Sequence, residues 1–450
     1  MNLKAALVAL TVLLAGLLAA PVSAVQGPAQ AQARTTHHEH KHTTEKRTHH
    51  QHAGRHGDKR RHHKKKGWVP PERVFWNIPI GSSEEQHRIE NVIQASIRHA
   101  KPGSYIRMAL FSFDRRPIAQ DLIDAYKRGV HVQVLLNDHQ VTRAMRMMNR
   151  AFGHVRKRKS FIYSCHDGCR AHGENLHSKF YLFSQTGQAS KTSITGSVNL
   201  TTNALIHQWN DGLVVHNDKV YDTFLSVFKE MKPDKPVKRP YEIFNINKRY
   251  QLQVMPFMNS NRHNDPIMKI LNKIRCSGAT HGAGSNGHTQ VRVDMHRWAG
   301  HRGAYLASKI VDLWAAGCDV KVMHGSASEE VRTAITRNTH RGRVPIRSNG
   351  FDENGDGVID RYTHHKLLII SGHYGKKTHE NRIYTGSSNW APSGLRGDEI
   401  IFRARGPKVF DQYLANFNYI WEHGSRPIPY GRHAMAMAEP KIGGKYWEND

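Results

Sequence analysis

The sequence predicts an α/β protein made of two similar halves, each an α/β/α sandwich, related by a pseudo-twofold axis. Short β-prone runs alternate with amphipathic helical runs over most of the chain, which is typical of a sheet covered by helices. One pair of short motifs occurs twice, and its two copies begin 187 residues apart, at His177 and His364. Between the copies, Lys232–Pro240 is rich in Pro and Lys, as expected of a linker.

The first 67 residues lack this pattern. Residues 1–24 contain one Lys, an apolar run and a small-residue end, so we expect a signal peptide cleaved after Ala24 and a secreted protein. A membrane anchor is the alternative, although the apolar run is short for a span. Residues 25–67 hold ten His and eleven Lys or Arg against three acidic residues, which predicts a disordered tail. Metal binding, adhesion to acidic polymers and a merely solvated segment are all compatible with this tail.

The first half, residues 68–231, is predicted to begin with a strand over 74–78 and a helix that starts at Ser82, where one Ser and two Glu form a capping pattern. The other predicted elements of this half are helices over 118–127 and 221–231 and strands over 105–113, 130–136, 177–184, 193–199 and 212–215. Apolar residues at helical spacing indicate the helices, and β-prone apolar runs indicate the strands.

A linker over 232–241 leads to the second half, residues 242–450, where the same alternation returns. Its predicted elements are strands over 250–256, 290–295, 319–323 and 364–371 and helices over 265–274, 305–316 and 409–421. Two copies of one unit, each with the same motifs, predict that the motifs face each other where the halves meet.

The motifs gather the same four side-chain types in each half. They are His177, Lys179, Ser197 and Asn199 in the first copy, and His364, Lys366, Ser387 and Asn389 in the second. On a strand, residues i and i+2 share a face, so His and Lys project together, as do Ser and Asn. Ammonium, hydroxyl and amide groups hold the oxygens of a phosphodiester well, while an imidazole attacks phosphorus or protonates the leaving oxygen.

An attacking imidazole needs an acceptor on its other ring nitrogen. Candidate acceptors follow the motifs at Asn210-Asp211 in the first half and at Asp398-Glu399 in the second. Of these, we select Asp211 and Glu399 as the groups that orient the imidazoles.

The duplicated His-x-Lys and Gly-Ser-x-Asn motifs resemble those of the phospholipase D superfamily, whose mark is His-x-Lys-x4-Asp followed by Gly-Ser-x-Asn. The resemblance covers the chain from about Phe75 to Gly424 and implies a phospholipase D-like fold. One departure is that the family's Asp is Ser184 in the first copy and Ser371 in the second. In the family this Asp supports the fold, so the departure affects the subfamily more than the chemistry.

The resemblance implies that His177 attacks phosphorus to form a phosphohistidine, and that His364 protonates the departing alcohol and then activates water. The near symmetry of the two copies leaves the choice of nucleophile open. The residues expected to hold the phosphate are Lys179, Lys366, Asn199 and Asn389, with Ser197 and Ser387 in support. This chemistry requires no cofactor.

We therefore expect a secreted, monomeric phospholipase D that cleaves the distal phosphodiester of phosphatidylcholine-type lipids to phosphatidic acid and an alcohol. Because such an enzyme works at a membrane surface, apolar side chains should line the rim of the site. Trp390, Pro392 and Trp209 are the candidates for this rim, with Trp390 expected to contact substrate. Head-group specificity and the choice of water or alcohol as acceptor do not follow from the sequence.

Two alternatives are a metal-independent nuclease of the same superfamily and an inactive binder of anionic polymers. The formal net charge is +29, of which the tail accounts for +8 and the signal peptide for +1, so the folded part is itself basic. A basic body fits nucleic acid, acidic lipid and anionic polymers, and does not choose among them. Complete His, Lys and Asn sets in both halves argue against the inactive binder.

Four cysteines in an exported chain predict two disulfides. We favour Cys165–Cys169 and Cys276–Cys318, because each bond stays inside one half. The alternative for the first pair is a metal site completed by His166 and His172.

A further segment, residues 352–360, copies the first nine positions of a calcium-binding loop. Its oxygen ligands would be Asp352, Asn354, Asp356 and Asp360. Position twelve is Thr363 instead of Glu, so a weak structural calcium site and a metal-free turn are both compatible with the sequence.

Overall fold

The computed structural model describes residues 67–171 and 174–428. The predicted signal peptide, residues 25–66 of the predicted tail and residues 429–450 lie outside the described residues. Within the described ranges, no helix is both long and apolar enough to cross a membrane.

The first half is built on a mixed sheet of seven strands. In spatial order they are β1 (Val74–Trp76), β8 (Asp211–His216), β6 (Ala189–Gly196), β5 (Phe180–Thr186), β2 (Tyr105–Leu110), β3 (His131–Asn137) and β4 (Phe161–Cys165). Strands β2, β3 and β4 are parallel, and the other neighbours are antiparallel. The parallel strands consist largely of buried residues because helices cover the sheet on both faces.

The second half is built on a sheet of nine strands. In spatial order they are β18 (Arg426–Pro427), β13 (Ile346–Ser348), β12 (Asp319–Ala327), β11 (Gln290–Trp298), β15 (Lys366–Tyr374), β16 (Lys377–Gly386), β17 (Ile400–Arg405), β10 (Tyr250–Val254) and β9 (Glu242–Phe244). From β13 to β10 this sheet repeats the spatial and chain order of β4 to β1 in the first sheet. The prediction of two similar α/β/α halves is therefore confirmed.

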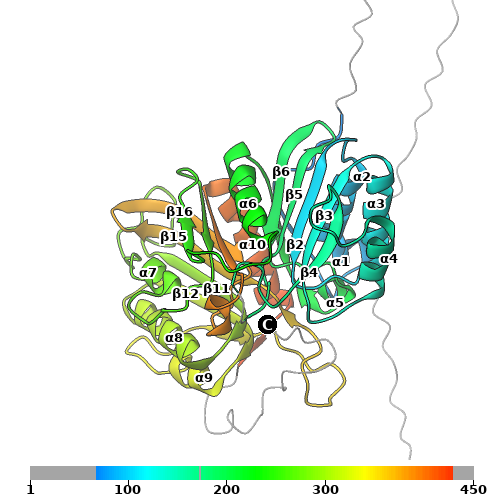
Figure 1. The fold of residues 1–450 in the computed structure, drawn as a ribbon. Helices are drawn as coiled ribbons and strands as arrows, with labels where there is room; N and C mark the ends of the chain where they lie inside the picture. The colour runs from blue at the N-terminus through cyan, green and yellow to red at the C-terminus, as the bar shows by residue number, and fades with distance from the viewer. Residues whose placement is uncertain (1–66, 172–173, 429–450) are drawn as a thin grey trace, which may run out of the picture. The chain divides into compact units, whose positions relative to one another are not determined.

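Helices separate into two outer layers and one shared central layer (Figure 1). The outer helices are α2 (Arg88–Arg98), α3 (Arg116–Lys127) and α4 (Arg143–Phe152) on the first sheet, and α7 (Pro266–Leu271), α8 (Gly300–Ala315) and α9 (Glu329–Ile335) on the second. The central helices, α6 (Asp218–Met231) and α10 (Pro407–His423), lie between the sheets. Their buried residues form one apolar core with the inner faces of both sheets.

Aromatic contacts show how this core crosses between the halves. The Phe224 ring of α6 lies 5.1 Å from Phe180 on β5 and 5.7 Å from Phe402 on β17. Both strands therefore pack on the same side chain. Burial of such large apolar groups stabilises the contact between the halves as well as each half.

Most predicted elements are present, with shifted ends. The motif strands begin later than predicted, because His177 and Lys179 precede β5 and His364 precedes β15. Among the elements named above, α4, α9, β4, β9, β13, β17 and β18 are not predicted by the sequence. In α4, the apolar spacing of Ala144, Met145, Met148 and Phe152 is interrupted by Arg residues. The predicted disulfides Cys165–Cys169 and Cys276–Cys318 are both confirmed.

Candidate active site

Two short strand contacts bring the motifs of the two halves together. Strand β7 (Gln208–Trp209) pairs in parallel with β14 (Tyr362–Thr363), and the His364 N–H donates to the Trp209 carbonyl over 2.9 Å. On the opposite side, Leu176 forms a parallel bridge with Asp398. Each motif His therefore follows directly after a contact with the other half.

A side chain from the other half orients each imidazole. His177 Nδ1 lies 2.8 Å from Glu399 Oε1, and His364 Nδ1 lies 2.9 Å from Asn210 Oδ1. All four side chains are buried. Because a carboxylate or a carboxamide oxygen accepts hydrogen bonds, each Nδ1 carries the hydrogen, and Nε2 is the reactive nitrogen.

The two orienting groups differ in charge. Burial alone would raise the pKa of Glu399, but the neighbouring His177 and Lys179 outweigh it and hold that pKa below its ordinary value. Glu399 is therefore a carboxylate, whereas Asn210 is neutral. A positive charge on His177 is stabilised by a buried anion, and a positive charge on His364 has no such partner in Asn210.

Lys179 and the two motif Asn residues are fixed by backbone contacts. Lys179 is buried, and its Nζ donates to the His177 carbonyl over 2.8 Å. The carboxamide oxygens of Asn199 and Asn389 accept the backbone N–H groups of Ser112 and Arg297, each over 3.3 Å. The other polar group of each Asn side chain is its NH₂, which can donate a hydrogen bond to a phosphate oxygen.

These residues occupy the two similar halves in matching positions, and the family comparison agrees with this duplication. A family model described as "Cardiolipin synthase, PLD-like domain" matches residues 93–232 and 286–421, one segment in each half. The chain belongs to the phospholipase D superfamily. As a superfamily member it carries a phosphodiesterase-like domain in two copies.

Solved structures with a similar chain course include three named proteins. Polyphosphate kinase from Porphyromonas gingivalis is 13% identical, with a TM-score of 0.49 over 78% of this chain and 50% of that one. Phosphatidylserine synthase from Haemophilus influenzae is 13% identical, with a TM-score of 0.48 over 79% of this chain and 87% of that one. Nuc from Salmonella typhimurium, a phospholipase D family member, is 19% identical, with a TM-score of 0.26 over 36% of this chain and 93% of that one.

This chain thus spans half the length of the polyphosphate kinase that it matches. Comparison with curated proteins finds no significant match.

Asp211 was predicted to orient an imidazole, but its carboxylate binds other groups. Its Oδ2 accepts the hydroxyl groups of Tyr413 and Thr385, each over 2.7 Å, and its Oδ1 accepts the Ser197 N–H over 3.0 Å. Asp211 therefore ties the first half to α10 and β16 of the second, and Asn210 takes the orienting role.

Serine contacts identify which residues of the two halves correspond. Ser197 Oγ accepts the N–H of Asp211, and Ser387 Oγ accepts the N–H of Ile400, so these two residues correspond. Asn210 then corresponds to Glu399. The segment from the motif Asn to the acceptor is one residue longer in the first half, so counting along the sequence fails. The Ser hydroxyls hold the acceptors: Ser197 Oγ donates to Asn210 Oδ1 over 2.9 Å.

The two serines that replace the family's Asp have structural contacts. Ser184 Oγ accepts the Tyr105 N–H over 2.8 Å. Ser371 Oγ accepts the Gly284 N–H over 2.9 Å and donates to Asn381 Oδ1 over 2.7 Å. Both therefore support the backbone around the motif strands, the role expected for this position.

The predicted apolar rim of tryptophans is wrong. Trp390 is 2% exposed, and its ring lies against Trp298 with centroids 4.8 Å apart. Trp209 is completely buried and packs near Tyr419. Both rings belong to hydrophobic cores, Trp209 to the core between the two sheets and Trp390 to the outer core of the second half. Pro392 is partly exposed.

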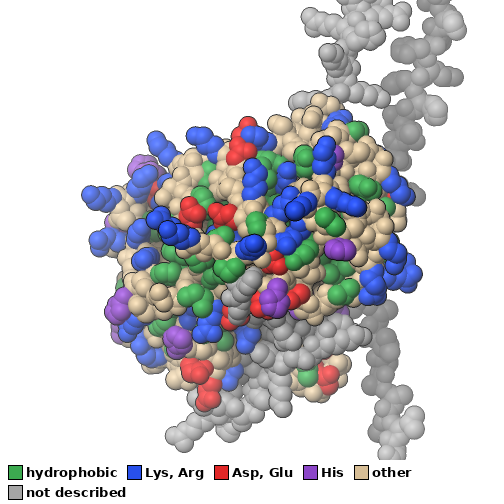
Figure 2. Space-filling model, in the orientation of Figure 1, with side chains coloured by type: hydrophobic (Ala, Val, Ile, Leu, Met, Phe, Trp, Pro, Cys, Tyr) green, Lys and Arg blue, Asp and Glu red, His purple; other side chains and the backbone are tan. Residues whose placement is uncertain are grey.

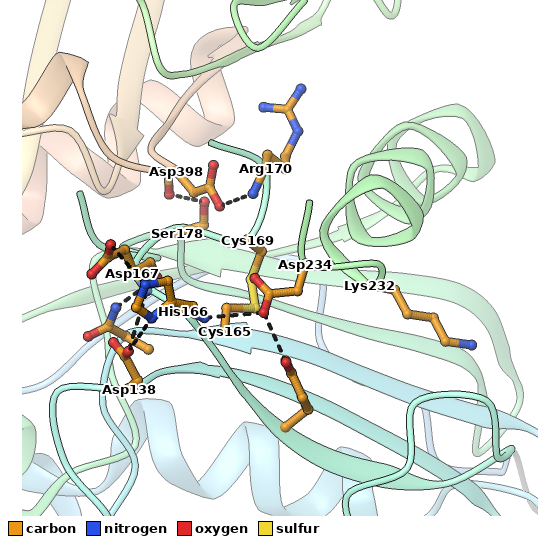
Figure 3. The surroundings of a disulfide bond; sticks show 12 residues. Asp138, Cys165, His166, Asp167, Cys169, Arg170, Ser178, Lys232, Asp234 and Asp398 are labelled. Carbon is orange, nitrogen blue, oxygen red and sulfur yellow. Dashed lines mark hydrogen bonds and ion pairs between the residues drawn. A yellow bond between two sulfur atoms is a disulfide. The ribbon is translucent and has the colours of Figure 1, made fainter. Parts of the chain in front are cut away.

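The Cys165–Cys169 loop supports the His177 side of the site (Figure 3). The Arg170 N–H that follows this loop donates to Asp398 Oδ2 over 2.9 Å, and Ser178 Oγ donates to the Asp398 carbonyl over 2.6 Å. Burial raises the pKa of Asp398 to about 7. Since the sulfurs form a disulfide, they are not metal ligands, and His172 lies outside the described residues.

The segment predicted as a calcium loop forms a turn held by its own side chains. Asp352 accepts the N–H groups of Gly355 and Gly357 over 2.7 and 2.8 Å, and Asp360 accepts that of Glu353 over 2.8 Å. Among the described residues, no three acidic groups of this turn offer oxygens within 4.8 Å of one another. Calcium binding here stays a prediction.

Proposed function

We propose that this protein is a secreted phospholipase D that hydrolyses the distal phosphodiester of phosphatidylcholine-type phospholipids through a phosphohistidine on His177. The observation that carries this proposal is the unequal pair of oriented imidazoles, one held by a buried carboxylate and the other by a carboxamide. The choice of His177 as nucleophile follows from Glu399, whose negative charge stabilises the cationic imidazole that forms on attack.

In the first step, His177 Nε2 attacks phosphorus and the bond from phosphorus to the head-group oxygen breaks. The His364 imidazolium gives its Nε2 proton to that oxygen, and the alcohol leaves. In the second step, His364 Nε2 takes a proton from water while the water oxygen attacks phosphorus. The bond from phosphorus to His177 then breaks, which releases phosphatidic acid and restores both imidazoles.

Charge on the phosphoryl oxygens is balanced by the remaining motif residues. Lys179 and Lys366 supply buried ammonium groups, and Asn199 and Asn389 supply amide donors, one of each from either half. Donors fixed before the reaction stabilise the charge of the transition state without reorganising. No step of this scheme requires a metal ion or an organic cofactor.

Release of choline from phosphatidylcholine vesicles by the full chain, in the presence of excess chelator, tests the proposal. We expect activity in the wild type and a loss on the order of 10³-fold or more in His177→Asn and in His364→Asn, because the two groups act in one reaction. His340→Asn, a change at an exposed His outside the motifs, is the matched control and should retain activity. Loss of all activity in chelator, restored by a divalent ion, would contradict the mechanism.

A nuclease of the same superfamily is the second candidate, favoured by the basic composition of the folded part. Parallel assays on plasmid DNA in chelator separate the two candidates. Rapid cleavage of DNA, with no head group released from any common phospholipid, would replace the first proposal with the second. Secretion is supported by the apolar N-terminal sequence and by the two disulfides.

A further inference from the structure

The segment from Val141 to Lys159, which contains α4 and the loop after it, is strongly basic. It holds no Asp or Glu and seven Lys or Arg, namely Arg143, Arg146, Arg150, Arg156, Lys157, Arg158 and Lys159. All but Arg156 are exposed. Figure 2 shows Lys and Arg side chains gathered at the edge where Figure 1 places α4. We refer to the exposed residues of 141–159 as the α4 surface.

The exposed cations of the α4 surface lack acidic partners in the part of the chain that the structure describes. Among the described residues, none of its six exposed cations forms an ion pair with an acidic side chain. The corresponding helix of the second half differs. α9 begins with Glu329 and Glu330, and Arg337 after it pairs with Asp312 over 2.7 Å. The excess of positive charge therefore belongs to one half and does not follow from the repeated fold.

Apolar side chains are exposed within the same surface. Val141 is 64% exposed and Val155 is 44% exposed. Val141 also lines a surface hollow of about 260 Å³, together with Met145 and Ile162. Exposed aliphatic side chains beside Lys and Arg are the combination that binds the interface of an anionic bilayer.

Ring contacts connect the α4 surface to the candidate active site. His139, two residues before Val141, stacks on Phe111 with ring centroids 4.1 Å apart. Phe111 in turn meets the His177 imidazole edge to face at 5.1 Å. The N-terminal end of α4 is also fixed there, because Thr142 Oγ1 donates to the Phe113 carbonyl over 2.7 Å. The N-terminal end of the α4 surface is therefore linked to His177 through two successive ring contacts.

We propose that the α4 surface is the site at which this protein docks on an anionic lipid bilayer, with Val141 inserted below the head groups. This inference rests on the proposed lipid function and assigns it a surface. A nucleic-acid groove would present aromatic rings for base stacking. Phe152, which is the Phe, Tyr or Trp of the segment, is 4% exposed and cannot stack on a base. The aliphatic exposure thus favours lipid over nucleic acid.

An environment-sensitive fluorophore on the full chain tests this placement. It is attached to Val141→Cys and, as a matched control, to Met258→Cys, because Met258 is 65% exposed and lies in the second half. Selective labelling is feasible because all four native cysteines form disulfides. With vesicles of phosphatidylcholine and phosphatidylglycerol, emission should shift to the blue at position 141 and stay unchanged at position 258. Equal shifts at both positions, or a shift at 141 with an oligonucleotide and none with vesicles, would overturn the proposal.

Charge removal gives an independent measurement on vesicles that contain phosphatidylglycerol. The triple variant Arg143→Ala, Arg150→Ala, Lys157→Ala should bind on the order of 100-fold more weakly, since each cation near the surface contributes roughly a factor of five. The control triple variant Lys269→Ala, Lys273→Ala, Arg275→Ala removes equal charge from exposed positions of the second half. Its binding should change little, and an equal loss in both variants would show that only net charge matters.

A soluble phosphodiester separates failure of the docking surface from failure of the proposed function. The α4 variants should hydrolyse bis(p-nitrophenyl) phosphate as the wild type does, because none of the altered residues belongs to the motifs. Wild-type hydrolysis without vesicle binding through position 141 would refute the docking surface alone. Vesicle binding through position 141 without hydrolysis of any phosphodiester would refute the proposed function alone.

Discussion

At the scale of single residues, the site depends on one difference between two otherwise matching positions. Glu399 and Asn210 each hold the Nδ1 of an imidazole from the other half, but one is an anion and the other is neutral. A buried negative charge next to an imidazole stabilises the cationic form of that imidazole. In the proposed mechanism the two motif histidines therefore have different roles, although their motifs share the same His-x-Lys pattern.

Replacing Glu399 with Gln should reduce turnover by about 10²-fold while leaving KM within a factor of about three. The carboxylate contributes mainly when positive charge develops on His177, so its loss acts on the transition state more than on substrate binding. Steady-state kinetics on a soluble phosphodiester measure this change. The counterpart Asn210→Asp should retain more activity and move the alkaline limb of the pH profile upward, because a second anion stabilises the His364 imidazolium. Full turnover in Glu399→Gln would contradict the assigned nucleophile.

Asp398 should make stability depend on pH. Its pKa is about 7 in the folded protein against an ordinary value of 3.8, because burial disfavours the carboxylate. The folded state then binds more protons than the unfolded state between about pH 4 and 7, so the free energy of unfolding falls as pH rises through this window.

This difference in the pKa of Asp398 corresponds to a fall of roughly 4 kcal/mol in the free energy of unfolding between about pH 4 and 7. In Asp398→Asn the side chain stays neutral, and this fall should be absent. Urea unfolding at pH 4, 5.5, 7 and 8 measures it. Asp218→Asn, at a 71% exposed position, is the control and should follow the wild type. Identical slopes in both variants would rule out a buried neutral carboxyl at position 398.

At the scale of elements, two disulfides close loops of very different length in different surroundings. Cys165–Cys169 spans four positions and adjoins the Arg170 contact to Asp398, whereas Cys276–Cys318 spans 42 positions. The entropy of the unfolded chain predicts a larger stabilisation for the longer loop. Proximity to His177 predicts a larger effect on activity for the shorter one.

Changing both cysteines of a pair to Ser should therefore separate stability from activity. Loss of Cys276–Cys318 should cost about 4 kcal/mol of unfolding free energy, and loss of Cys165–Cys169 about 2 kcal/mol. Turnover at low temperature should nevertheless fall more in the second variant, because the segment that positions His177 is loosened. Urea unfolding and soluble-substrate kinetics provide the two measurements. An activity loss that merely follows stability would contradict the positioning role of the loop.

The sequence predicts those elements whose apolar residues follow a regular helical or strand spacing. Strands and helices with regular apolar spacing and both disulfides are predictable in this way. Helix α4 is not, because its Arg residues hide an apolar face that becomes clear only against the sheet. The predicted start of the motif strands is also too early, since β5 begins at Phe180 and β15 at Lys366.

The sequence could also predict the His, Lys and Asn positions, but not which groups orient the imidazoles. That assignment depends on the contact of Leu176 with Asp398 and of β7 with β14, which join residues from different halves. No local pattern encodes such a register. The same limit explains the tryptophans, because burial of Trp390 depends on packing against Trp298, far away in sequence.

At the scale of the whole molecule, neither half contains a complete site. His177 depends on Glu399, His364 depends on Asn210, and Phe224 joins the two sheets in one core. Separate chains of residues 1–231 and 232–450 should each lack detectable turnover, and co-expression should restore part of it. Assays of each chain alone and of the pair measure this, with the intact protein as reference. Turnover by one half alone would show that it forms a site with a second copy of itself.

A segment that has been copied usually becomes free to change, because the other copy preserves the original task. In this protein neither copy is free to change alone, because each half supplies the side chain that orients the imidazole of the other half. A substitution at Glu399 alters the hydrogen bond of His177, which lies 222 positions earlier in the chain. A substitution at Asn210 alters the hydrogen bond of His364, which lies 154 positions later. The two copies are consequently inherited as one unit, in which selection on either motif also acts on the opposite half.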